Sequence, residues 1–272
     1  MKPIQMIAFM IGVVACGAAN AQDCQPTEDF QTVVPGKLTV VHGEYPPAAF
    51  TRDGMRGYTA ELIEQIAIEY CLEIDALPVE FAAVVQYLVE GRADVSIGGW
   101  YRSATRAEVV GVSAPVVLDQ MAIYSKDGLD SIEQLAGKSV GTVSGFMWVP
   151  DLQEVFGNNL QLYPNPVTMA QDLASGRLDA GIDGYATGLY AQQTGNYPAA
   201  IQIKVPEPDP RVGASVLPAQ TGFLYAKENT EFGAALDASI VRLRNDGTLA
   251  SILVSYGLDP VIANVGEPRL VD

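Results

Sequence analysis

Histidine, cysteine and cationic side chains are all scarce in this chain of 272 residues. Its single histidine and three cysteines, with no C-x-x-C pair among them, do not supply the ligand set of a zinc site, so we expect no metal. Only 16 Lys and Arg residues stand against 32 Asp and Glu residues, and the resulting formal charge of −16 argues against nucleic acid or anionic lipid as a partner. The sequence contains no nucleophile–base pair and no phosphate-binding loop, so we expect no cofactor either.

Long apolar runs are also missing, and the one at the N-terminus is short. Lys2 precedes an apolar run of about ten residues, too few for a membrane span of roughly 20, and small residues follow with an A-x-A sequence at 19–21. This pattern predicts a signal peptide over residues 1–21. A second interpretation is a lipoprotein signal, in which Cys16 would carry the lipid. In either case the chain leaves the cytoplasm, and we expect a periplasmic protein.

Cysteine number then becomes informative. If Cys16 leaves with the signal peptide or is lipidated, Cys24 and Cys71 remain. An even pair in an oxidising compartment predicts a Cys24–Cys71 disulfide. The alternative is a pair of free, buried thiols.

Buried strands and amphipathic helices alternate along the rest of the chain. Residues 37–42 have the pattern of a buried strand, and residues 138–143 that of another. Residues 232–256 form an amphipathic helical pattern that Asp246-Gly247 interrupts. Alternation of this kind predicts an α/β fold with parallel strands.

An internal repeat indicates two such units. Residues 86–99 align without a gap with residues 171–184, and seven of the fourteen positions are identical. Each copy predicts a helix, a glycine that ends it, and a strand that enters a sheet. Two copies 85 residues apart favour two similar α/β lobes over one continuous sheet.

These features, in order, resemble the amino-acid-binding class of bacterial periplasmic solute-binding proteins, which serve ABC importers. The resemblance extends from about residue 37 to 256. It is carried by the order and spacing of the following landmarks: Tyr45-Pro-Pro47, Leu88-x-x-Gly-Arg-x-Asp94, Ser103-x-x-Arg106, Ser113-x-Pro115, Leu135-x-Gly-Lys-x-Val-Gly141, Gly176-Arg-x-Asp179 and Leu243-Arg-x-Asp-Gly-Thr-Leu249.

The resemblance implies a two-lobed periplasmic-binding-protein fold. Each lobe is expected to be a mostly parallel sheet flanked by helices, with the ligand cleft between the lobes. Residues 23–124 and 207–272 would form lobe one, and residues 125–206 lobe two. The two strands that cross between the lobes would fall near 122–124 and 202–204.

The same resemblance implies ligand-binding residues in lobe one. Arg106 would grip a ligand carboxylate with its planar guanidinium, and Ser103 would organise the turn before it. Tyr45 and Phe81 would form aromatic walls, because flat apolar faces exclude water. Gly99 ends the strand beside the site, and Tyr101 would fill space that most relatives leave open.

Lobe two and the first strand supply further candidates. Asp183 would pair with a ligand ammonium, although its spacing also allows Gly184 to occupy that place. The backbone of Ser144 and Gly145 would contact the ligand. His42 stands where relatives commonly carry an acid, which argues against a lysine- or arginine-like ligand.

The sequence therefore predicts a solute-binding protein, not an enzyme, that binds a small amino-acid-like ligand and acts as a monomer with an ABC transporter permease. One alternative is a cleft enzyme like the cyclohexadienyl dehydratases, for which Glu44 is the only plausible proton donor. Another is a ligand-presenting partner of a sensor.

Overall fold

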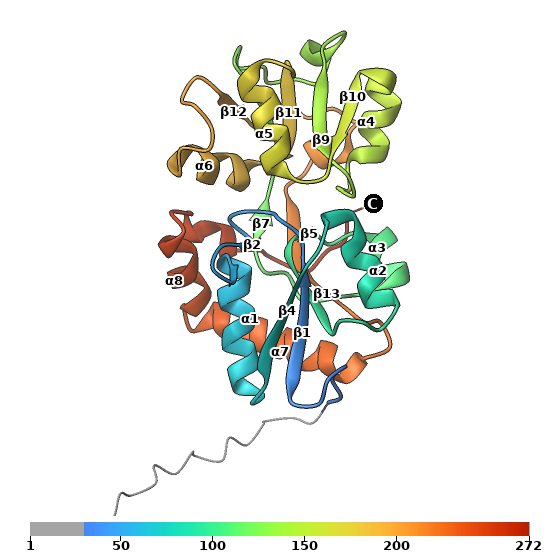
Figure 1. Ribbon diagram of the computed structural model, residues 1–272, viewed down its shortest axis with the longest axis vertical. Helices are drawn as coiled ribbons and strands as arrows, with labels where there is room; N and C mark the ends of the chain where they lie inside the picture. The colour runs from blue at the N-terminus through green and yellow to red at the C-terminus, as the bar shows by residue number, and fades with distance from the viewer. Residues whose placement is uncertain (1–29, 272) are drawn as a thin grey trace, which may run out of the picture.

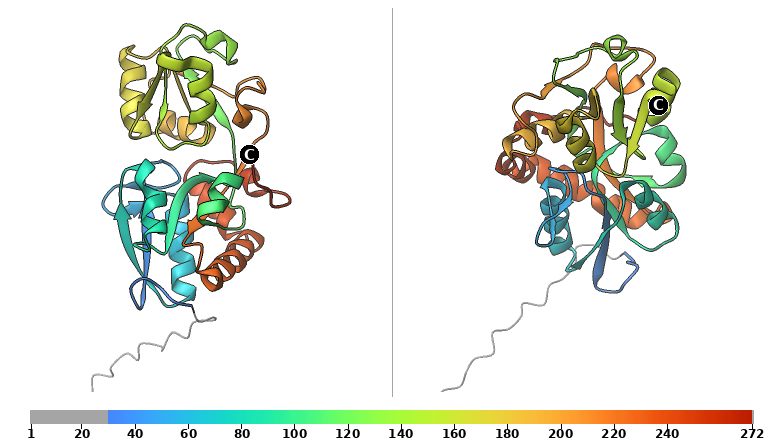
Figure 2. Two further views of the ribbon diagram at one scale, coloured as in Figure 1. Left: turned by 90° about the vertical axis from the view of Figure 1, so that its right-hand side faces the viewer. Right: turned by 45° about the horizontal axis from the view of Figure 1, so that its top comes forward.

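Two lobes, each built around one β-sheet, make up the computed structural model, which describes residues 30–271 (Figure 1). The lower lobe of Figure 1 combines the N-terminal (blue) and C-terminal (red) parts of the chain, and the upper lobe contains the middle. The left view of Figure 2 shows the same separation from the side. The predicted two-lobed α/β fold is confirmed. Within the described range, no helix is both long and apolar enough for a membrane crossing.

The first sheet has the strand order β4-β1-β5-β13-β6, with β7 also paired to β13. Strands β4, β1 and β5 are parallel, whereas β13 runs antiparallel to β5. The sheet is therefore mixed, with a parallel half from the βα units and an antiparallel half from the returning chain. Its strands are β1 (Lys37–His42), β4 (Glu73–Pro78), β5 (Val95–Tyr101), β6 (Gly111–Val112), β7 (Leu118–Asp119) and β13 (Ala219–Tyr225). A short hairpin, β2 (Phe50–Thr51) and β3 (Met55–Arg56), lies apart from it.

The second sheet has the order β10-β9-β11-β8-β12 and is mixed in the same way. Strands β10, β9 and β11 are parallel, and β8 is antiparallel to both β11 and β12. Its strands are β8 (Met121–Ser125), β9 (Val140–Val143), β10 (Leu160–Tyr163), β11 (Ala180–Gly184) and β12 (Gln202–Lys204).

The predicted crossing strands at 122–124 and 202–204 are wrong. Both segments lie inside the second sheet, where β8 and β12 pair with each other. The crossing from the first lobe instead follows β7, which pairs with β13, so the chain enters the second sheet at Met121. The apolar pattern of residues 121–125 indicates a buried strand but does not specify which sheet supplies its antiparallel partners.

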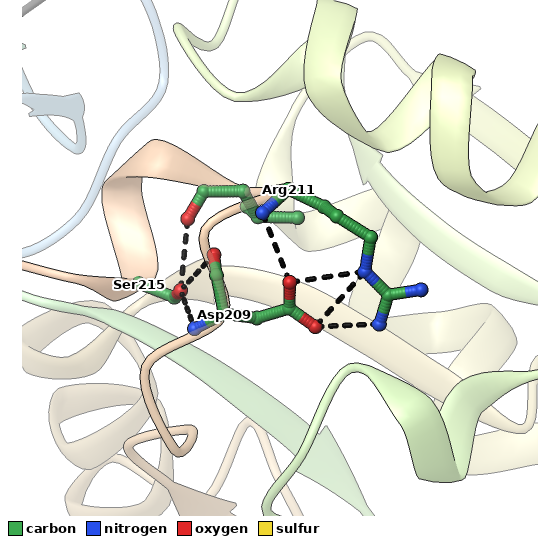
Figure 3. Close-up of polar contacts among 4 residues, drawn as sticks. Asp209, Arg211 and Ser215 are labelled. Carbon is green, nitrogen blue, oxygen red and sulfur yellow. Dashed lines mark hydrogen bonds and ion pairs between the residues drawn. The ribbon is translucent and has the colours of Figure 1, made fainter.

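The return to the first lobe is the loop 205–218, which packs against the second lobe. Its backbone donates hydrogen bonds to the carbonyl of Asp130 and to the carboxylate of Asp151. Figure 3 shows its internal contacts: Arg211 binds the carboxylate of Asp209 through Nε and Nη2, and Ser215 Oγ accepts from the Asp209 amide at 2.8 Å. The Asp209–Arg211 pair lies at the surface and stabilises by well under about 1 kcal/mol.

Helices cover the faces of both sheets (Figure 1). The C-terminal helical pattern breaks at Asp246 and Gly247, as the sequence predicted, and Gly247 has a φ of 84° that favours glycine. The helices of the first lobe are α1 (Tyr58–Glu69), α2 (Val84–Val89), α3 (Ala104–Val109), α7 (Thr230–Asn245) and α8 (Thr248–Ser255). Those of the second lobe are α4 (Val149–Phe156), α5 (Pro166–Ser175) and α6 (Tyr185–Gln193).

Candidate functional site between the lobes

The carboxyl ends of the parallel strands of both sheets face one another between the lobes, where α/β sheets usually bind small molecules. A small cavity lies there. The first lobe lines it with residues from the ends of β1 and β5, from the 3-10 turn at 81–83 and from α3, and the second lobe with the loop between β9 and α4. The lining residues are Tyr45, Phe81, Gly99, Tyr101, Arg106, Phe146, Met147 and Trp148.

Five of the predicted ligand-binding residues therefore come together on one cavity: Tyr45, Phe81, Gly99, Tyr101 and Arg106. The close packing depends on Gly99, because a Cβ there would lie 2.2 Å from a ring carbon of Tyr45. The structure brings these residues together without testing what they bind. Their ligand-binding role stays a prediction.

Aromatic rings fill most of the cleft. Phe81 stacks on Trp100 with ring centroids 4.2 Å apart, and Phe146 of the second lobe packs edge-on against both Phe81 and Tyr45. Trp148 makes a similar edge contact with Tyr101. The cavity that remains has a volume of about 10 Å³, roughly enough for one water molecule. A solute the size of an amino acid can enter only when the lobes part or Phe146 moves.

Arg106 lies at the junction of the two lobes. Its Nη1 donates to the carbonyl of Tyr101 in its own lobe at 2.8 Å, and its Nη2 donates to the carbonyl of Gly145 in the other lobe at 3.2 Å. The guanidinium carbon also lies 5.2 Å from the ring centroid of Trp100, within the range of a cation–π contact. Burial lowers the pKa of Arg106 to about 10, so the side chain remains cationic at neutral pH.

Ser103 and the Ser144–Gly145 turn position this arginine. Ser103 Oγ accepts a hydrogen bond from the Arg106 amide at 3.2 Å and so caps α3. Gly145 has a φ of 86°, and its carbonyl accepts from the guanidinium. The Ser144 side chain does not line the cavity. In this state both Ser103 and Gly145 hold Arg106.

His42 and Asp183 are buried beside the cleft, and neither lines the cavity. His42 Nδ1 lies 3.4 Å from the carbonyl oxygen of Gly43, and burial lowers the pKa of the imidazole, which keeps it neutral at pH 7. Asp183 Oδ1 accepts from the amide of Gly184 at 2.7 Å, whereas Oδ2 has no hydrogen-bond partner. Burial raises the pKa of Asp183 well above its usual value, which favours the protonated carboxyl.

Gly184 lies against the first lobe. A Cβ at this position would come within 2.3 Å of the Tyr45 hydroxyl oxygen and 2.7 Å of Asp119 Oδ2. The strand end that was expected to present Asp183 therefore presents bare backbone to Tyr45. The sequence had left the choice between Asp183 and Gly184 open.

The sequence missed two features of this region. The side chains of Phe146, Met147 and Trp148 line the cavity, although the sequence suggested only backbone contacts from this loop. Asp119 on β7 receives hydrogen bonds from the hydroxyl groups of two cavity residues, Tyr45 and Tyr101. Three successive large apolar residues after a strand-end glycine were a usable signal for the first feature. No local pattern marked Asp119.

Glu44, the proton donor that a cleft enzyme would need, does not line the cavity. Its Oε1 accepts from the amide of Thr51 at 2.9 Å, in the hairpin that begins at β2. In the range 30–271, no three His, Cys, Asp or Glu side chains gather as a metal site would require.

Two predicted features depend on residues near the N-terminus. The signal peptide at 1–21, with Cys16, lies outside the described residues. Cys71, which follows α1, is disulfide-bonded, but Cys24 also lies outside the described residues, so the Cys24–Cys71 pairing stays a prediction.

Comparisons with known proteins agree with this architecture. The L-cystine-binding protein TcyJ of Escherichia coli (strain K12) is 25% identical over 222 residues, covering 79% of this chain and 80% of its own. The probable amino-acid-binding protein YxeM of Bacillus subtilis (strain 168) is 24% identical over 265 residues, 93% of each chain. The structure of an ancestral arginine-binding protein bound to arginine superposes with a TM-score of 0.71 at 26% identity, covering 81% of this chain and 98% of that one.

Residues 38–259 match the family described as bacterial extracellular solute-binding proteins, family 3. The description of this family names solute binding, and the relatives above are named for binding cystine, amino acids or arginine. The chain therefore belongs to the family 3 extracellular solute-binding proteins, and it is a binding protein and not an enzyme.

Proposed function

We propose that this protein captures a small amino-acid-like solute by the solute's carboxylate and delivers it, as a periplasmic monomer, to the membrane permease of an ABC importer. The observation that carries the proposal is Arg106. Its guanidinium lies at the lobe junction and contacts two backbone carbonyls, and none of the ion pairs within residues 30–271 includes it. A guanidinium presents a planar fork of donors that fits a carboxylate, so a ligand carboxylate replaces neutral carbonyls with an opposite charge.

The aromatic lining supports a small, partly apolar ligand. Tyr45 and Phe81 from one lobe and Phe146 from the other exclude water, which strengthens any charged contact made at Arg106. The amino acids named for the relatives, cystine and arginine, both carry the α-carboxylate that this site would hold.

Binding must be coupled to movement of the lobes, because the closed cleft has room for about one water molecule. Arg106 already bonds to both lobes, so a ligand at the same place contacts both. Such a ligand binds the closed form better than the open one, and it shifts the equilibrium by that difference in affinity.

The test is a thermal-shift screen of the twenty amino acids and L-cystine, followed by calorimetry on the tightest binder. Arg106→Ala should weaken binding by about 2–5 kcal/mol, because a desolvated carboxylate loses its partner charge. Arg92→Ala is the matched control, because Arg92 lies on the surface at the other end of β5. Wild-type affinity in Arg106→Ala would remove Arg106 from the site, and a screen without any binder would end the proposal.

The periplasmic location is tested separately on the secreted protein. Mass spectrometry of the mature N-terminus should show Gln22 as the first residue, after cleavage at Ala21. A mature chain that begins at a lipidated Cys16 would instead place the protein on a membrane surface.

A further inference from the structure

Asp119 is a buried acid behind two tyrosines of the cleft, and its position was not evident from the sequence. It lies on β7, the strand that leads from one lobe to the other, and it is buried. The hydroxyl groups of Tyr45 and Tyr101 both donate to its Oδ2, at 3.4 and 3.3 Å. The two tyrosines that line the cavity thus direct their hydroxyl groups at one carboxylate oxygen.

The surroundings of Asp119 favour its ionised form more than those of Asp183 do. Besides the two phenols, the amide of Gln120 donates to Asp119 Oδ1 at 2.9 Å, and the amide of Ala186 in the first turn of α6 faces the carboxylate. Asp183 has one backbone donor, and its Oδ2 has none. Hydrogen bonds donated to a carboxylate stabilise its ionised form, whereas burial without such hydrogen bonds favours its protonated form.

Arg106 and Asp119 are opposite charges that do not neutralise each other. Tyr101 lies between them: its backbone carbonyl accepts from Arg106, and its hydroxyl donates to Asp119. None of the ion pairs among residues 30–271 includes either side chain. A buried charge is stable only when it is paired, so the cleft is complementary to a ligand that carries one charge of each sign.

The space beside Asp119 is also suited to a cationic group. Asp119 borders a second cavity of about 400 Å³, formed by β7, the start of α6 and residues 257–264, which is within the size range of small-molecule sites. The only charged residues in its lining are Asp119 and Asp259, both acidic. Arg106, by contrast, lines the aromatic cavity, which contains no acid.

We propose that Asp119, and not Asp183, binds the ammonium group of the ligand, so that the ligand lies with its carboxylate at Arg106 and its ammonium towards β7. This proposal rests on the proposed function. It explains Gly184, because any side chain there would collide with Asp119 Oδ2 and the Tyr45 hydroxyl when the lobes close. Asp119 is then the residue that distinguishes an amino acid from an acid that lacks an amine.

The test compares an amino acid with its 2-hydroxy analogue, in which a hydroxyl replaces the ammonium. The probes are the tightest-binding L-amino acid of the screen and its matched hydroxy acid, for example phenylalanine with phenyllactate or leucine with 2-hydroxyisocaproate. Calorimetry is done with wild type, Asp119→Asn, Asp183→Asn and the exposed surface control Asp127→Asn. Asp119→Asn should weaken the amino acid at least about 30-fold and the hydroxy acid less than about 3-fold.

The remaining outcomes decide between the two acids. An ammonium-specific loss in Asp183→Asn, or equal losses of both probes in Asp119→Asn, would overturn the assignment to Asp119. Asp127→Asn should change neither affinity. If wild type binds no amino acid at all, the proposed function fails first and this inference fails with it. If wild type binds and Asp119→Asn is unaffected, only this inference fails.

A measurement on wild type covers the case in which Asp119→Asn does not fold. Burial raises the pKa of Asp119 to about 6. Amino-acid affinity should therefore fall as pH drops from 8 to 5, because the protonated acid no longer attracts an ammonium, whereas hydroxy-acid affinity should not. Four tyrosines face Asp119, and burial raises the pKa values of Tyr45, Tyr58, Tyr101 and Tyr124, so these stay neutral across this range. Asp183 also faces Asp119, so the titration is repeated with Asp183→Asn, in which the ammonium-specific pH dependence should remain. Equal pH dependence of both probes would contradict the proposal.

Discussion

The two copies of the internal repeat, residues 86–99 and 171–184, fold alike at one end and differ at the other. In each copy a helix stops at a glycine with positive φ, Gly91 at 65° and Gly176 at 78°, and a strand follows. An identical aspartate then binds the start of the neighbouring strand. Asp94 accepts from the Thr39 amide at 2.8 Å, and Asp179 accepts from the amide of Ser139 at 2.8 Å.

The far ends of the repeats both meet Tyr45, and they meet different parts of it. Gly99 faces the ring of Tyr45 within the first lobe, whereas Gly184 faces its hydroxyl from the second lobe. The preceding positions are unlike: Gly98 has a φ of 127°, which favours glycine, and Asp183 is a buried acid. The shared residues of the repeat thus establish the turn and the strand entry, and the unshared ones determine what faces the cleft.

The largest expected difference between the lobes is in the free energy of unfolding that a disulfide contributes, because residues 125–206 contain no cysteine. We predict that Cys71 of the first lobe pairs with Cys24. Replacing both with Ser should lower the free energy of unfolding by about 3–4 kcal/mol, since the bridge restricts the unfolded chain. Urea unfolding of the double variant measures the loss. Non-reducing peptide mapping is the check on the pairing, and recovery of both peptides unlinked and alkylated would disprove it.

The sequence predicted those parts of the fold that local patterns encode. The strand at 37–42, the helix break at Asp246-Gly247 and both copies of the repeat depend on neighbouring residues, and all are present. The position of the crossing strands was wrong, because the partners of β8 lie about 60 to 80 residues away in β11 and β12. Asp119 was missed for the same reason: its phenol donors lie 18 and 74 residues away.

The next largest difference is in the effect of an Ala substitution on stability at the two glycines that face Tyr45. Gly99→Ala should lower the free energy of unfolding by about 1–3 kcal/mol, because the new methyl group meets a buried ring of the same lobe. Gly184→Ala is the matched variant. Its methyl group meets Tyr45 and Asp119 only across the lobe junction, so it should leave stability nearly unchanged and weaken ligand binding.

Urea unfolding and calorimetry of both variants separate these effects. If Gly184→Ala loses as much stability as Gly99→Ala, the two lobes unfold as one packed unit. The contrast between a contact within a lobe and a contact between lobes would then be lost.

The smallest expected difference concerns the identical aspartates, whose pKa values shift in opposite directions. Burial raises the pKa of Asp94 even though it accepts from the amides of Val33 and Thr39. Hydrogen bonds from Ser139 lower the pKa of Asp179, which lies at the surface. As pH falls from 6 to 3, folded Asp94 takes up its proton before unfolded Asp94 does, so its contribution to the free energy of unfolding rises. At Asp179 the unfolded chain takes up the proton first, so stability is lost.

Replacing each aspartate with Asn removes its own contribution and leaves the acid titration of all other carboxylates in place. Relative to wild type, Asp179→Asn should therefore lose less stability between pH 6 and pH 3, and Asp94→Asn should lose more. Urea unfolding at several pH values gives the two difference curves, in which the background titration cancels. Opposite signs mean that one repeated sequence places the same carboxylate in two electrostatic environments. Curves of the same sign would mean that burial of Asp94 does not outweigh its two amide hydrogen bonds. The two copies of the repeat would then be alike in the electrostatic environment of this aspartate as well as in fold.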